Sequence, residues 1–109
     1  MDMTLDVTQV LLGLDGEAMM DGDKPVTLRP ICTNALMATM EADKGMSGED
    51  KVKIWSLAGK IQKEDRPSLV AEDVALLKKR IGAAYGPAIV GPAFLLLNGT
   101  AATPPAAKK

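Results

Sequence analysis

The chain of 109 residues has no histidine and a single cysteine, Cys32, and these shortages exclude several kinds of site. Without histidine there is no Ser-His or Cys-His catalytic pair, and the usual zinc sites lack their common ligand. A lone cysteine cannot form a disulfide within the chain. Because Cys32 lies at helical spacing among apolar residues, we expect its thiol to be buried and not to act as a nucleophile.

Aromatic residues are also scarce: 47% of the residues are hydrophobic, but the only aromatic residues are Trp55, Tyr85 and Phe94. The core must therefore be built from aliphatic side chains and methionine, and few rings remain for stacking on nucleobases. No apolar run approaches the roughly 18 residues of a membrane span. The acidic N-terminal residues do not resemble a secretory signal, so we expect a soluble cytoplasmic protein.

The net charge is only −1, but the charges are unevenly distributed. Residues 1–50 sum to −7 and residues 51–109 to +6. This asymmetry permits head-to-tail association or docking on an acidic partner. The alternative is that folding interleaves the two halves and cancels the field.

The stretch LGLDGEAMMDGDKPVTL, residues 12–28, contains two Asp-Gly pairs and four acidic side chains. It does not fit an EF-hand, because the fifth loop position would be Met19 or Pro25 where an oxygen ligand is needed. The apolar run before Asp15-Gly16 instead predicts a β-hairpin, with strands over 4–14 and 17–28. A divalent site of another kind stays open, because four carboxylates this close attract cations.

Helical spacing follows the hairpin and predicts three or four helices. The first covers 28–41, with Thr27 as its N-cap. The second is capped by Ser47, and its core stripe of Ile54, Leu57, Ala58 and Ile61 is widened by Val52 and Trp55. The third begins at 71–73, and the fourth covers 88–97 after Pro87. The short segments 25–28 and 67–70 could pair as a small strand ladder.

The second and third predicted helices carry most of the basic side chains, namely Lys51, Lys53, Lys60, Lys63, Lys78, Lys79 and Arg80. They could contact phosphates or an acidic protein, or form an ordinary solvated surface. A helix-turn-helix is the main alternative to a protein-binding role. However, the connector is longer than usual, and Lys78-Lys79-Arg80 lacks the neighbouring amide side chains that usually read base edges.

The C-terminal apolar run includes Phe94, Leu95, Leu96 and Leu97 and is hydrophobic on every side. Such a segment is either buried against the other helices or exposed as a docking surface, and we favour burial. We place one domain at 1–97 and a flexible tail at 98–109, where Pro104-Pro105 stands among alanines.

No motif for catalysis or cofactor binding is present. The glycines at 82, 86 and 91 do not have dinucleotide-binding spacing, and Gly59-Lys60 is followed by Ile61 where a P-loop needs Ser or Thr. Each pair of neighbouring carboxylates has a turn or a helix cap as its explanation. We therefore expect no enzyme activity, no metal and no cofactor.

The order of the segments TQVLLGLDGEAMMDGDKPVTLRPICTNALM, SGEDKVKIWSLAGKI and AEDVALLKKRIGAAYGPAIVGPAFLLL resembles small accessory proteins of tailed bacteriophages and prophages. The resemblance covers roughly residues 5–97. It implies a non-enzymatic role in head or tail assembly, or the binding of a host factor, inside the bacterial host or in the virion. No catalytic residue is implied.

The sequence thus predicts a single α+β domain in which an N-terminal β-hairpin is followed by three to four helices. We expect it to act by contact with a phage structural or host protein, with self-association as a further possibility. A small regulator associated with DNA or RNA, acting through the basic residues above, is the second hypothesis. A steep loss of binding with rising salt would distinguish it.

Overall fold

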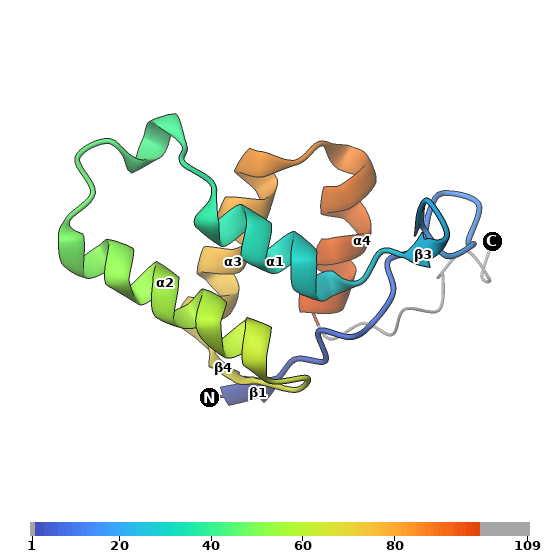
Figure 1. Cartoon of the computed structure of the whole chain (residues 1–109), viewed down its shortest axis with the longest axis horizontal. Helices are drawn as coiled ribbons and strands as arrows, with labels where there is room; N and C mark the ends of the chain where they lie inside the picture. The colour runs from blue at the N-terminus through green and yellow to red at the C-terminus, as the bar shows by residue number, and fades with distance from the viewer. Residues whose placement is uncertain (1, 99–109) are drawn as a thin grey trace.

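The structure, a computed structural model, describes residues 2–98 (Figure 1). In this range lie the helices α1 (Leu28–Met37), η1 (Glu41–Asp43, a 3-10 helix), α2 (Gly48–Lys63), α3 (Ala71–Ala84) and α4 (Pro87–Leu97). The strands are β1 (Asp2–Thr4), β2 (Met20–Asp21), β3 (Lys24–Pro25) and β4 (Ser68–Val70). The predicted α+β class, with an N-terminal hairpin before the helices, is confirmed. Except for Asn98, the predicted flexible tail lies outside the described residues.

Both Asp-Gly pairs form turns, so the N-terminal hairpin is more broken than predicted. An isolated bridge joins Leu12 to Ala18 around the first pair, and β2 pairs antiparallel with β3 around the second. The loop between β2 and β3 has two residues, and its first, Gly22, has φ +68°, a conformation that glycine adopts without strain. The continuous strands predicted over 4–14 and 17–28 are wrong, because the second turn reverses the chain inside the second of them.

A second small sheet joins the N-terminus to the middle of the chain. β1 pairs antiparallel with β4, with Met3 opposite Leu69. The pairing continues outside the strands, since the backbone N–H of Leu5 donates to the carbonyl of Pro67 at 3.0 Å. The predicted ladder between 25–28 and 67–70 is therefore wrong.

The start of α1 is held by the chain that precedes the hairpin. The helix begins after Thr27 as predicted, but the Thr27 side chain makes no capping hydrogen bond. Instead, the first backbone N–H groups, of Leu28 and Arg29, donate to the carbonyls of Gln9 and Val7, each at 2.9 Å. The first turn is thus satisfied by main-chain acceptors.

The other helices begin close to the residues that the sequence predicts. Ser47 caps α2, and its hydroxyl accepts from the Asp50 N–H at 3.1 Å. The predicted start of α3 at residue 71 is confirmed, and α4 begins at Pro87, one residue before the predicted 88. α1 ends at Met37, four residues before the predicted end, and Ala38 is extended.

The core lies where the four α-helices and the segment from Leu5 to Leu11 meet. Aliphatic side chains fill it, among them Leu28, Leu36, Ile61, Leu77 and Ile81. Cys32 is 0% exposed, which confirms its predicted burial, and desolvation raises the pKa of its thiol to about 12. In the folded protein the thiol is therefore shielded from solvent, and burial favours its protonated form.

Candidate functional site

A cavity of about 560 Å³ lies between the C-terminal end of α1, the segment around η1, and the N-terminal half of α2. We call it the α1–α2 cavity. Met37, Met40 and Met46 line it together with Lys51, Ile54 and other residues of these segments. Thioether side chains are flexible and polarisable, so a methionine lining adapts to apolar groups of different shapes.

Arg80, from α3, lies in the wall of this cavity and is only 5% exposed. Its guanidinium donates to the carbonyls of Ala35, Leu36 and Ala38 at 3.1, 3.1 and 2.7 Å. It also donates to Asp43 Oδ1 at 2.5 Å, and this hydrogen bond is the main cause that lowers the pKa of the Asp43 carboxyl. The arginine thus supplies donors to the unpaired carbonyls at the end of α1.

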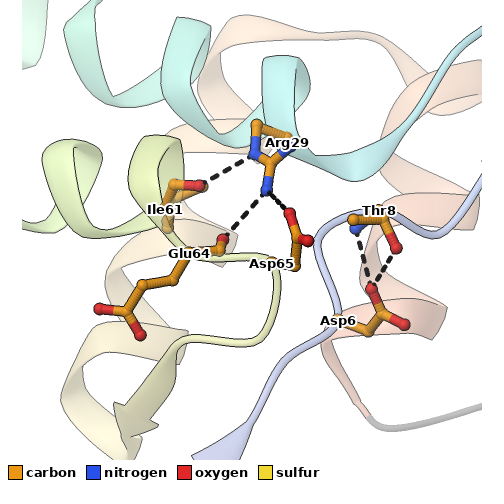
Figure 2. Close-up of polar contacts among 6 residues, drawn as sticks. All are labelled: Asp6, Thr8, Arg29, Ile61, Glu64 and Asp65. Carbon is orange, nitrogen blue, oxygen red and sulfur yellow. Dashed lines mark hydrogen bonds and ion pairs between the residues drawn. The ribbon is translucent and has the colours of Figure 1, made fainter.

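A second arginine, Arg29, does the same for α2 (Figure 2). Its guanidinium donates to the carbonyls of Ile61 and Glu64, each at 3.1 Å, and to Asp65 Oδ1 at 2.5 Å. Sequence reasoning missed this residue. Only an indirect signal for such an arginine is present in the sequence. Neither α1 nor α2 is followed by the glycine that commonly ends a helix, so the last carbonyls of each helix need another donor.

Close to Arg29, the carboxylate of Asp6 accepts hydrogen bonds from a residue of its own turn (Figure 2). It accepts from the Thr8 hydroxyl at 2.5 Å and from the Thr8 N–H at 3.0 Å. These hydrogen bonds are the main cause that lowers the pKa of Asp6, to which Arg66 adds a smaller contribution. This local cluster fixes the turn at 6–8, beside the segment that caps α1.

The basic residues predicted as an interaction surface differ in exposure and in their contacts, so they do not form one exposed patch. Arg80 is buried, so grouping it with the exposed basic side chains is wrong. Lys60 donates to the Ser68 carbonyl at 2.5 Å, and Lys78 donates to Asn98 and lies 5.9 Å from the centroid of the Phe94 ring. The exposed lysines among the candidates are Lys51, Lys53, Lys63 and Lys79, three of them on α2.

The C-terminal apolar run is divided between core and surface. Leu96 and Leu97 are 3% and 1% exposed, in agreement with the burial that the sequence favoured. Phe94 is half-buried, and Leu95 is 39% exposed. Because one side of α4 faces the core, little of the run remains for docking.

The largest exposed aromatic side chain lies instead on α2. Trp55 and Val52 are 67% and 61% exposed and lie on α2 outside the buried stripe of Ile54, Leu57 and Ile61. The prediction that they widen the core stripe is therefore wrong. Trp55 lies one turn beyond Lys51, which lines the α1–α2 cavity, so the two side chains are neighbours on the helix surface. We call the α1–α2 cavity with Trp55 and Val52 the Trp55 surface.

The hairpin region presents a different exposed surface. Leu14 is fully exposed and Met20 is 51% exposed. The exposed carboxylates of Asp15, Glu17, Asp21 and Asp23 lie close to them in the sequence, and Asp15 Oδ1 accepts from the Glu17 N–H at 3.0 Å. Among residues 2–98, no three Asp, Glu, Cys or His residues lie close enough together to hold a metal ion.

Comparison of the chain with protein-family models, with curated proteins and with solved structures finds no match. Within the described part of the chain, no helix is both long and apolar enough to cross a membrane. The functional interpretation therefore depends on the surfaces described above.

Proposed function

We propose that this protein acts by binding another protein through the Trp55 surface and catalyses no reaction. The observation that carries the proposal is the exposure of Trp55, one helical turn from Lys51, which lines a cavity rich in methionine. Tryptophan is enriched among the residues that dominate binding energies, and exposing it to water without a partner is unfavourable. The resemblance to phage accessory proteins supplies the setting, which is virion assembly or the binding of a host factor.

Two features support protein over nucleic acid as the partner. The buried Arg80 contributes nothing to an exposed basic patch, and Lys60 and Lys78 already donate to acceptors within the protein. Of the remaining exposed lysines, Lys51 lines the cavity of the Trp55 surface. An aromatic side chain surrounded by a polar rim is typical of a protein interface.

Affinity capture from phage-producing bacteria tests the proposal. The tagged protein is compared with Trp55→Ser and with Leu95→Ser, a matched control that removes an exposed apolar side chain from α4. We expect one stoichiometric protein to co-purify with the parent and with Leu95→Ser, to survive nuclease, and to be lost with Trp55→Ser. Thermal melting of both variants verifies that they are folded.

The alternative outcomes identify the other hypotheses. Loss of all captured material on nuclease treatment, with binding that falls steeply between low and moderate salt, favours the regulator associated with DNA or RNA. Loss of the partner with Leu95→Ser but not with Trp55→Ser moves the binding surface to α4.

A further inference from the structure

We propose that the Trp55 surface of one copy binds the acidic hairpin, residues 12–25, of a second copy, so that the protein associates head to tail. This inference rests on the proposed function, because it uses the same surface and names one occupant for it. It is carried by apolar and charge complementarity between two exposed regions of the same chain.

The acidic hairpin has the chemistry of a ligand for such a surface. Leu14 and Met20 are large apolar side chains that extend into solvent, and Leu14 has no neighbours to cover it. Around them the hairpin carries four exposed carboxylates and a single basic residue, Lys24. Among the ion pairs between described residues, none involves these four carboxylates.

The Trp55 surface has the complementary properties. Its α1–α2 cavity, at about 560 Å³, is large enough to accept an aliphatic side chain such as that of Leu14, and its methionines can adapt to it. Lys51 lies at the edge, and Lys53 and Lys63 are exposed on the same helix. In the cavity lining, Arg80 and Lys44 pair with Asp43 and Glu41, at 2.5 and 3.0 Å, so Lys51 is the basic residue of the lining outside these two ion pairs. On α2 the exposed Lys51, Lys53 and Lys63 outnumber the exposed Glu49 and Asp50, which leaves a small excess of positive charge.

Folding cancels the charge asymmetry of the sequence only in part. Three ion pairs join an acidic or basic residue of the first half to one of the second: Arg29–Asp65, Arg66–Asp6 and Arg80–Asp43. All three lie outside the acidic hairpin. The negative charge of the hairpin and the positive charge of the exposed α2 lysines therefore persist on the folded surface.

The two regions cannot meet within one molecule. The hairpin, labelled by β3 in Figure 1, extends from the right end of the molecule, whereas α2 lies at the left. A contact between them must join two copies, and the surfaces used by the two copies are different. Such a heterologous contact repeats from copy to copy and gives rings or open chains.

Two single variants and their mixture test this arrangement. Leu14→Ser removes the apolar group of the hairpin, and Trp55→Ser removes the aromatic side chain of the receiving surface. We expect the parent to show a mass in sedimentation equilibrium that rises with concentration and beyond a dimer, and each variant alone to remain monomeric. The mixture must form dimers and nothing larger, because Trp55→Ser supplies an intact hairpin and Leu14→Ser an intact receiving surface. Leu95→Ser should associate like the parent.

Fluorescence gives an independent measurement, because Trp55 is the only tryptophan. Association should bury its ring, so the emission of the parent should shift to shorter wavelength with concentration and return as salt is raised. Leu14→Ser should show no shift on its own.

A parent that stays monomeric to millimolar concentration overturns the inference, and so does a Leu14→Ser variant that still associates with itself. Neither result affects the proposed function, which fails separately if Trp55→Ser still captures the partner protein.

Discussion

Arg80 shows how a single residue can join distant parts of this small fold. Its side chain links α3 to the end of α1 and to η1, and it leaves no buried side-chain donor or acceptor without a partner among the described residues. The buried Arg80 guanidinium is therefore held in one fixed geometry by its hydrogen bonds. A buried charge is stable only when its donors are satisfied in this way.

Replacing Arg80 should consequently destabilise the protein strongly. Arg80→Met keeps the volume but leaves the carbonyls at the end of α1 and the Asp43 carboxylate without their donor. We expect the free energy of unfolding to fall by about 3 kcal/mol, measured by urea denaturation. Lys79→Met, at the exposed neighbouring position, is the control and should change it little. Equal effects for the two variants would contradict the capping role.

Because Asp43 can be protonated, the stability contributed by the Arg80–Asp43 contact depends on pH. The hydrogen bond from Arg80 lowers the pKa of its carboxyl below the ordinary value of 3.8. The folded protein therefore binds this proton less tightly than the unfolded chain, so the contribution is present above pH 3.8 and is lost as pH falls through the lowered pKa. Asp43→Asn should be less stable than the parent at pH 6, and the difference between the two should shrink toward pH 2. A difference that is constant with pH would contradict this assignment.

At the scale of elements, the sequence predicted helices better than strands, and the reason is visible at particular residues. Ser47 caps α2 with a contact three residues away, and Pro87 opens α4, so both signals are local. The end of α1 depends on Arg80, more than 40 residues later, which no local pattern reveals. The partner of β4 is β1, which lies near the N-terminus, more than 60 residues earlier, so local patterns do not reveal this pairing either.

The proposed binding surface was only partly predictable. The exposed lysines of α2 were recognised as candidates, but helical spacing alone placed Trp55 in the core. Apolar residues at 52 and 55 extend the stripe in sequence, whereas α1, the helix packed against α2, covers only the part of α2 that contains Ile54, Leu57 and Ile61. How wide a helix face is buried depends on its neighbours, and these are known only from the tertiary structure.

The two predicted caps can be compared directly. Ser47→Ala removes the hydroxyl that accepts from the Asp50 N–H, and we expect a loss of about 1 kcal/mol in the free energy of unfolding. Thr27→Ala should cost much less, because the first N–H groups of α1 donate to Gln9 and Val7 instead. Urea denaturation of both variants measures this difference. Similar losses would show that the Thr27 hydroxyl contributes to the start of α1.

For the molecule as a whole, Cys32 reports on whether the fold opens in parts or as one unit. Its thiol lies in α1, which contacts α2, α3 and α4, and it is completely buried. A reagent can reach it only after these contacts are broken, and burial also keeps the sulfur protonated in the folded state, since its pKa is about 12. We expect the free energy obtained from the rate of thiol labelling to equal that from urea denaturation and to decrease with urea at the same slope. Cys32→Ala supplies the unreactive control. Labelling that is faster and independent of urea would instead mean that α1 separates locally from its neighbours, and the α1–α2 cavity beside it would then open in the native state.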